Sequence, residues 1–318
     1  MDTFMIMLKN VLIFVLLAVP GYLLVRGKKL TQKDSGGFSL LLTNVCIPFM
    51  ILSSALKLEF SGEFTRSILI TGIIGILFTL VMFFATGPMT AKVQNEKTRG
   101  IMRFCMIFAN NGFIGIPLAK AVFGDGSAVM AYLIILNVIN NVMLFTLGIF
   151  LVSGDKKTIS VKKGLMNPVL ISFLIGVALN LLGVGKAVPE LQTYATYFSN
   201  AVTPLSMVVL GMKLADVPLP HLLTSRRMYH VSAVRLVIYP LLAAACTLLL
   251  SKIPGLPVTA DSVIAVFIAL AMPTAGLASA FADQHKGDTE SAVIFTLGTT
   301  VLSVIPIPLL YSLLRLIV

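Results

Sequence analysis

Charged residues divide this sequence into long apolar stretches that follow one another from end to end. Crossing the hydrocarbon layer of a membrane as a helix takes about 20 residues, and most of the stretches reach that length. The three shorter ones, which begin at residues 10, 104 and 236, extend backwards past a single basic residue. The stretches are residues 10–25, 35–56, 67–91, 104–119, 126–154, 164–185, 191–212, 236–251, 262–282 and 291–314. We therefore predict an all-α polytopic membrane protein with ten transmembrane helices.

Two of these stretches contain residues that interrupt a helix near its middle. The fourth stretch holds residues 109–117 (ANNGFIGIP), and the ninth holds residues 271–276 (AMPTAG). Asn, Gly and Pro are poor helix formers. Unpaired backbone groups are tolerated inside a membrane only where protein or a water-filled cavity surrounds them. Helices broken at mid-membrane are typical of transporter binding sites, so we predict that helices 4 and 9 are broken and form the site.

Composition and charge agree with a place in the lipid bilayer. The chain is 57% hydrophobic and 12% charged, whereas soluble domains have about 25% charged residues. The net charge of +11 could suit a nucleic acid, but most of the 24 basic residues lie in short connectors after the odd-numbered stretches. Basic connectors stay in the cytoplasm. We therefore expect a multi-pass protein of the cell membrane with both termini outside the cytoplasm, no soluble domain and no nucleic-acid partner.

The second half of the chain repeats features of the first half. Residues 43–48 (TNVCIP) correspond to residues 199–204 (SNAVTP) at an offset of 156, and Pro117 falls on Pro273 at the same offset. An odd number of helices per repeat inverts the second repeat relative to the first, which is an architecture of secondary transporters. Chance similarity between apolar segments is the alternative. The two predicted repeats are residues 1–155 and residues 156–318, with five helices each.

The centre of the fourth stretch supplies the first candidate binding residues, Asn110, Asn111 and Gly112. A helix that restarts after a break presents free N–H groups and a positive dipole end, and both suit a carboxylate. The two amides add neutral donors and acceptors. The same residue types also hold neighbouring membrane helices together, so a substrate role and a packing role are both open.

Further amides lie in the second, fifth and seventh stretches. Asn44 and Asn200 occupy matching places in the two repeats, and they either make a substrate cavity polar or bond a neighbouring helix. Asn137, Asn140 and Asn141 share one face of the fifth helix because they are three and four residues apart. A face with three amides is unfavourable in lipid. We expect it to face the broken segments, with Asn137 and Asn141 as candidate substrate ligands.

The remaining candidates are two prolines, a threonine and a pair of charges. Pro117 and Pro273 are either ordinary helix kinks or, as their equivalent places favour, the points where two broken helices cross. Thr274 either offers a hydroxyl to a substrate or bonds its own backbone. Arg235 either extends to the membrane interface or is a charge partner of an anionic substrate or of Asp283.

Some classes of protein do not fit this sequence. The 13 acidic residues all lie in connectors or at the ends of the apolar stretches, so no buried carboxylate pair is expected for an intramembrane protease. The zinc-protease motif HExxH and the P-loop motif are absent. The three cysteines have no metal-ligand spacing. We therefore expect neither an enzyme nor a protein with a metal or another cofactor.

Several segments together resemble the auxin efflux carrier family, which includes the plant PIN-formed carriers and bacterial permeases for malate or malonate. The segments are residues 44–48, residues 110–118 with Lys120, and residues 204–214, 271–273 and 291–295. The resemblance covers essentially the whole chain. It implies a ten-helix inverted-repeat fold similar to bile-acid symporters and sodium/proton antiporters. The long central loop of the plant carriers is absent and Thr274 replaces their amide, so the chain is more similar to the bacterial-type permeases.

The resemblance also implies roles for parts of the chain. Helices 1, 2, 6 and 7 would form a scaffold, helices 3–5 and 8–10 would form a transport part, and the protein would be a homodimer. Asn110 would contact a substrate carboxylate, and Pro117 and Pro273 would mark the crossing of helices 4 and 9.

Our leading hypothesis is a secondary active transporter of small organic anions such as carboxylates. It would work by alternating access of an elevator-like transport part, driven by protons or by the membrane potential. A sodium-coupled symporter similar to the bile-acid carriers is one alternative. The other is a membrane sensor of the same fold that binds its ligand without transporting it.

Overall fold

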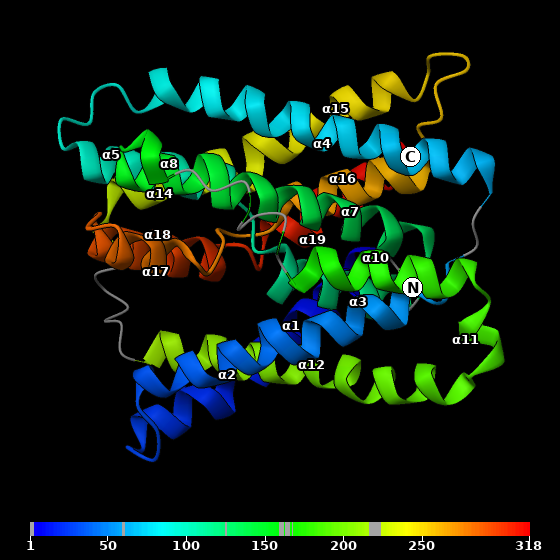
Figure 1. The fold of residues 1–318 in the computed structure, drawn as a ribbon. Helices are drawn as coiled ribbons and strands as arrows, with labels where there is room; N and C mark the ends of the chain where they lie inside the picture. The colour runs from blue at the N-terminus through cyan, green and yellow to red at the C-terminus, as the bar shows by residue number, and fades with distance from the viewer. Residues whose placement is uncertain are drawn as a thin grey trace.

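The computed structural model is all-helical in the part of the chain that it describes (Figure 1). No strand occurs among these residues, although one isolated β-bridge joins Ala109 to Thr274. The described residues are 3–58, 61–124, 126–158, 162, 166, 168–215 and 224–318. An all-helical architecture is therefore confirmed for this part of the chain.

Six helices in the described part are long and apolar enough to cross a membrane. A bent pair, α18 and α19, is a seventh if the 54° bend between the two helices lies within one span. The long helices are α1 (Thr3–Arg26), α2 with α3 (Ser35–Leu41 and Ile47–Ala55), α4 (Gly62–Met89), α7 with α8 (Ala128–Met143 and Ile149–Ser153), α12 (Pro189–Ala215), α14 with α15 (Arg226–Ala233 and Tyr239–Leu250), and α18 with α19 (Thr289–Leu302 and Pro306–Leu314). A multi-pass membrane protein is thus supported, and the count of ten spans stays a prediction.

Shorter helices stand at the fourth, sixth and ninth predicted stretches. α5 (Glu96–Ile107) and α6 (Ile116–Phe123) replace one continuous fourth helix, and α16 (Ala260–Ala271) and α17 (Ala278–Gln284) replace the ninth. α10 (Pro168–Leu181) occupies the sixth stretch, of which most of the beginning lies outside the described residues. The chain therefore breaks within the two segments whose Asn, Gly and Pro residues predicted a break. Three short elements complete the described chain: η1 (Gln32–Asp34), η5 (Lys156–Thr158) and α11 (Val184–Ala187).

π-Helical turns interrupt the described helices at four places: η2 (Leu42–Cys46), η3 (Asn111–Gly115), η4 (Leu144–Gly148) and η6 (Val234–Ile238). Three of them end directly before a helix whose second residue is a proline, namely Pro48, Pro117 or Pro240. Proline lacks an N–H and clashes with the carbonyl four residues earlier. A widened turn before the proline accommodates this clash, and such turns occur frequently at functional sites.

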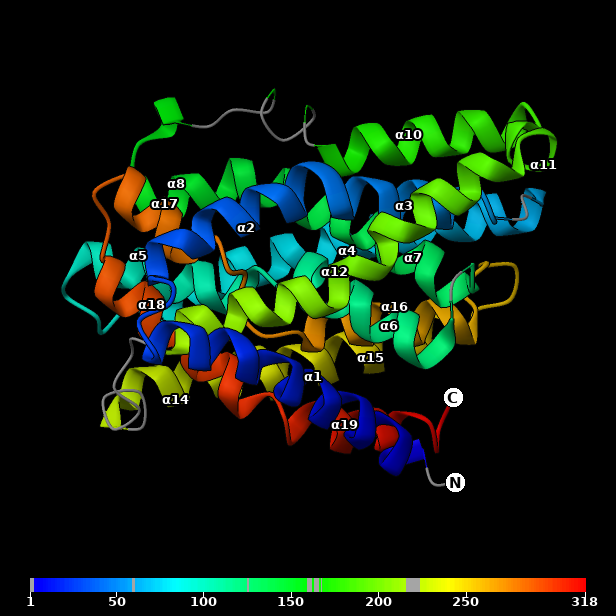
Figure 2. The ribbon, with the colours of Figure 1, turned by 90° about the horizontal axis from the view of Figure 1, so that it is seen from below.

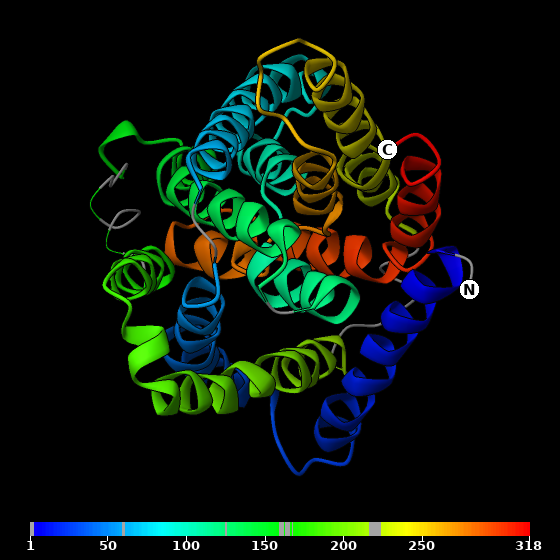
Figure 3. The ribbon, with the colours of Figure 1, turned by 90° about the vertical axis from the view of Figure 1, so that its right-hand side faces the viewer.

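The helices pack in two groups. The first group contains α1, α2, α3, α10 and α12, and the second contains α4, α5, α7, α8 and α14 to α18. In Figure 3, blue α1 and lime α12 of the first group lie below cyan α4 and yellow α15 of the second group. α1 contacts α6 and α19, so these helices join the two groups.

The two chain ends lie at the same end of the bundle. α1 begins and α19 ends at the end opposite to α5 and α17, as Figures 1 and 2 show. This arrangement is required of a chain whose two termini lie on one side of a membrane.

Candidate substrate site

The two broken helices meet where their backbones are unwound. The Asn110 N–H donates to the Pro273 carbonyl oxygen at 2.8 Å, and the Ala275 N–H donates to the Phe108 carbonyl oxygen at 2.9 Å. These bonds form the isolated antiparallel bridge between the two segments. They pair backbone groups that the breaks remove from their helices, each of which would cost about 1–3 kcal/mol if left buried and unpaired.

Asn140 on α7 completes the pairing at the crossing. Its Oδ1 accepts a hydrogen bond from the Ala109 N–H at 3.3 Å, and its Nδ2 donates to the Ala109 carbonyl oxygen at 3.2 Å. One side-chain amide thereby replaces both helical partners of Ala109. The amide face of the fifth predicted stretch lies against the broken segments, as the sequence predicted.

Thr274 lies inside the crossing and is fully buried. Its Oγ1 donates to the Cys105 carbonyl oxygen at 2.9 Å, and its N–H donates to the Thr299 Oγ1 at 3.1 Å. The Thr274 hydroxyl therefore bonds the other broken helix and not its own backbone, and Thr274 does not line the cavity described below.

Arg235 is fully buried on η6 and bonds carbonyl groups at the ends of both broken helices. Its Nε donates to the Met272 carbonyl oxygen at 2.8 Å, and its Nη1 donates to the Ile107 carbonyl oxygen at 2.9 Å. Longer contacts of 3.4 and 3.5 Å reach the carbonyls of Met106 and Ala269. α5 and α16 end here, so a single guanidinium faces the negative dipole ends of two helices.

This arrangement corrects two of the sequence interpretations of Arg235. A fully buried side chain in the middle of the fold does not extend to the membrane interface. Asp283 is exposed on α17 and is not its partner. The sequence could not identify backbone carbonyls as partners, because carbonyl groups become free only where a helix ends.

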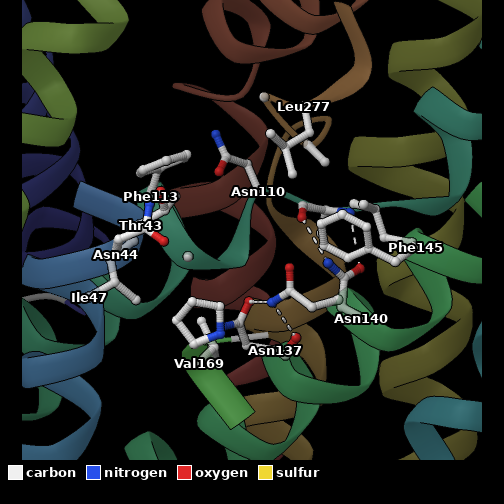
Figure 4. A pocket seen from close by; sticks show the side chains of 17 residues that line it. Thr43, Asn44, Ile47, Asn110, Phe113, Asn137, Asn140, Phe145, Val169 and Leu277 are labelled. Carbon is white, nitrogen blue, oxygen red and sulfur yellow. Dashed lines mark hydrogen bonds between the residues drawn. The ribbon is translucent and has the colours of Figure 1, made fainter. Parts of the chain in front are cut away.

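A cavity of about 250 Å³ lies beside the crossing. Its wall comes from both broken segments, from the π-turns η2, η3 and η4, from the amide face of α7 and from the start of α10. Figure 4 shows side chains from these elements around the cavity. The lining residues are Thr43, Asn44, Ile47, Ala109, Asn110, Gly112, Phe113, Asn137, Asn140, Asn141, Leu144, Phe145, Pro168, Val169, Ala275, Gly276 and Leu277. The wall is therefore polar through amides and carries no charged side chain of its own.

Most of the predicted substrate-binding residues lie in this wall: Asn44, Asn110, Gly112, Asn137 and Asn141. Asn111 is buried without lining the cavity. The Asn137 Nδ2 is buried and has no hydrogen-bond partner among the described residues. Since a buried amide without a partner is costly, the Asn137 amide is a candidate donor to a ligand oxygen. The sequence did not single out Phe145 or Val169 in the wall, because an apolar side chain in an apolar stretch carries no signal.

Of the two prolines predicted to mark the crossing, Pro273 lies at the crossing and Pro117 lies beyond it. Pro273 supplies the carbonyl that Asn110 bonds. Pro117 is the second residue of α6, directly after the π-turn η3, which widens the helix before the proline. The structure therefore places the crossing at Asn110, several residues before Pro117.

Lys120 links the broken fourth helix to α12 of the first helix group. Its Nζ on α6 donates to the Ser199 Oγ at 2.8 Å and to the Asn200 Oδ1 at 3.0 Å, both on α12. Asn200, which the sequence paired with Asn44, thus bonds a neighbouring helix and lies outside the cavity wall.

Comparisons with known proteins find similarity to membrane transporters. A family model described as "Membrane transport protein" matches residues 6–311. An uncharacterized transporter of Methanothermobacter thermautotrophicus is 29% identical over 313 residues, which cover 95% of this chain and 96% of that protein. An uncharacterized transporter of Methanocaldococcus jannaschii is 27% identical over 142 residues, which cover 44% of this chain and 46% of that protein. The family match includes both broken helices and every residue of the cavity wall.

Proposed function

The chain belongs to the membrane transport protein family, which contains the auxin efflux carriers, and on that premise we propose that it is a secondary transporter of small organic anions. Family membership makes it a transporter and not an enzyme. The finer proposal concerns the substrate class and the way in which the substrate moves. It rests chiefly on the amide-lined cavity at the crossing, with the unpartnered Nδ2 of Asn137 in its wall.

The helix ends around the cavity support an anionic substrate. The helical segment of η3 and α6 begins at the cavity, and its second and third residues, Gly112 and Phe113, lie in the wall. The first N–H groups of a helix have no partner within it, and this end carries the positive dipole. A carboxylate in the cavity would accept hydrogen bonds from these groups and from the Asn110 and Asn137 amides.

The opposite helix ends support a carrier that does not need sodium. In many transporters, carbonyls at the C-terminal ends of half-helices coordinate a sodium ion or a proton. Here Arg235 already donates to the carbonyls that end α5 and α16. This observation favours coupling to protons or to the membrane potential over the sodium-coupled alternative.

The position of the cavity supports alternating access. Asn44 and Val169 belong to the first helix group, whereas Asn110, Asn137 and Leu277 lie in the broken segments and in the second group. A movement of the second group against the first would carry the crossing and its ligand from one membrane face to the other. The two groups would then be the transport part and the scaffold of an elevator.

The test is uptake of labelled mono- and dicarboxylates into proteoliposomes, with and without a sodium gradient. We expect saturable, sodium-independent uptake of at least one acid. Asn110→Ala and Asn137→Ala should each weaken apparent binding by about 10- to 100-fold, because a hydrogen bond to a charged group contributes about 1.5–3 kcal/mol. Asn10→Ala is the matched control, since Asn10 lies on α1 and bonds only the Ile6 carbonyl.

Each other result points to a different conclusion. Binding without accumulation would support the sensor. Uptake that requires sodium would support the symporter and contradict the role given to Arg235. Unchanged uptake in both cavity variants would move the site away from the crossing.

A further inference from the structure

A second, smaller cavity of about 30 Å³ lies on the other side of Asn110. It shares Asn110, Phe113 and Gly276 with the first cavity, so these residues form the wall between the two. Its remaining wall comes from η3, α12 and α18. The volume suffices for a water molecule or for the end of a carboxylate group.

Lys213 lies in the wall of this second cavity. It belongs to the last turn of α12 and is partly buried. Side chains on a helix lean towards its N-terminus, which directs the Lys213 stem back along α12, towards Ser206 in the same wall. In the part of the chain that the structure describes, Lys213 has neither a hydrogen bond nor an ion pair. A cation partly withdrawn from water without a partner is unfavourable, and an anionic ligand in this cavity would compensate the cost.

Lys213 is the only charged side chain in the walls of the two adjoining cavities. Both walls consist entirely of described residues, and the other polar groups in them are neutral amides and hydroxyls. Side-chain amides can find hydrogen-bond partners on a carboxylate and on its uncharged amide analogue, because they both donate and accept. Discrimination between an anion and a neutral molecule of the same shape therefore falls to Lys213 and to the helix ends.

We propose that Lys213 is the charge-selecting residue of the substrate site and that its ammonium pairs with an anionic group held beside Asn110. This inference rests on the proposed function, since it assumes that the cavity at the crossing binds the substrate. Lys213 directly follows the seventh apolar stretch, so the sequence pattern alone predicts a basic residue of a cytoplasmic connector. Lys213 also matches Lys57 at the repeat offset of 156.

The experiment compares two acids with their amides. Thermal stabilisation of the purified protein is measured with butyrate, succinate, butyramide and succinamide for the wild type, Lys213→Met, Lys213→Arg and Lys252→Met. Lys252 is exposed in the turn after α15 and serves as the control. A ligand that binds only the folded protein raises its melting temperature.

We expect at least one acid, and neither amide, to stabilise the wild type and Lys252→Met. Lys213→Met should lose at least tenfold in affinity for that acid, while Lys213→Arg keeps most of it. Without ligand, Lys213→Met should melt at the same temperature or higher, because the variant removes an unpartnered cation. A merely structural lysine would give the opposite change.

Two results would overturn the inference, and they differ in what else they affect. If Lys213→Met binds the acid as tightly as the wild type does, the charge-selecting role is wrong and the proposed function stands. If no acid stabilises the wild type, the proposed function fails and the inference fails with it.

Discussion

Arg235 and the crossing of the broken helices stabilise each other. The guanidinium needs partners because a buried cation without them is costly. The carbonyls of Ile107 and Met272 need donors because their helices end there. The planar guanidinium carries five donors in a fixed fork, whereas a lysine ammonium is a compact point charge. Replacing this residue by lysine is therefore not a conservative change.

The first prediction concerns this residue. Arg235→Met should lower the free energy of unfolding by at least about 2 kcal/mol, because two short bonds to buried carbonyls are lost and each orphaned carbonyl costs about 1–3 kcal/mol. The free energy of unfolding of Arg235→Lys should lie between those of Arg235→Met and the wild type. Thermal unfolding of the purified protein measures both. Arg315→Met is the control, since Arg315 is exposed after α19, and equal melting of Arg235→Met and this control would refute the capping role.

Single residues were predictable where a polar side chain stood in an apolar stretch. This signal found Asn110 and Asn137 in the cavity wall. It could not separate them from Thr274, whose hydroxyl bonds a backbone carbonyl inside the crossing. It also could not give Lys213 a place in a cavity, because a lysine near the end of a span reads as a connector residue. Such distinctions depend on which segments cross in space, and a linear pattern does not contain that information.

At the scale of elements, the contact of α1 with α12 depends on glycine. A Cβ atom on Gly21 would clash with the Val208 carbonyl, and a Cβ atom on Gly211 would clash with the Ala18 carbonyl. Small residues at such places let two membrane helices approach closely. Both clashes would be with backbone atoms, which cannot turn aside as a side chain can. The two helices therefore have to separate if either glycine is replaced.

The second prediction follows from this contact. Gly211→Ala should destabilise the protein by about 1–3 kcal/mol, the usual cost of overpacking, even though alanine favours a helix over glycine by about 1 kcal/mol. Gly87→Ala on α4 is the matched control, because a Cβ atom there would meet no atom within 4 Å. We expect the control to melt at the same temperature as the wild type or higher. If Gly211→Ala behaved like Gly87→Ala, the close approach of α1 and α12 would be wrong.

The elements show which local patterns are reliable. The breaks in the fourth and ninth stretches were predictable, because several weak helix formers stand together there. The π-turns were not, although Pro48, Pro117 and Pro240 follow three of them. Proline predicts a distortion before it, but the packing of neighbouring helices decides whether this distortion is a kink, a break or a widened turn.

At the scale of the whole molecule, the positions of charged residues and the lengths of the helices give different numbers of spans. Charged residues divide the sequence into ten apolar stretches, but only six or seven described helices are long enough to be a span. The two numbers differ because some helices are broken, as at α5 and α6, and because α10 begins next to residues that the structure does not describe. The inverted repeat and the orientation of the termini stay predictions, because both need the membrane sides to be identified.

Under the proposed alternating access, one contact between the broken fourth helix and the first helix group would be specific to this conformation. Lys120 on α6 bonds Ser199 and Asn200 on α12. If the second group slides against the first, these two bonds have to break. Asn44 lines the cavity and is exposed in this conformation. Lys120 therefore stabilises the conformation in which Asn44 is accessible.

The third prediction is that Lys120→Met shifts the population away from this conformation. A loss of about 1.4 kcal/mol changes a two-state equilibrium about tenfold, so labelling of a cysteine at position 44 by a membrane-impermeant thiol reagent should slow by up to about that factor. The background replaces the native cysteines at positions 46, 105 and 246 by alanine. Lys252→Met is the control, because Lys252 is exposed after α15.

Slower labelling in Lys120→Met alone would show that this contact stabilises one conformation of the proposed movement. A loss of global stability would have the opposite effect, because it would expose position 44 and speed its labelling. Equal rates in both variants would mean that the two groups do not move against each other at this contact.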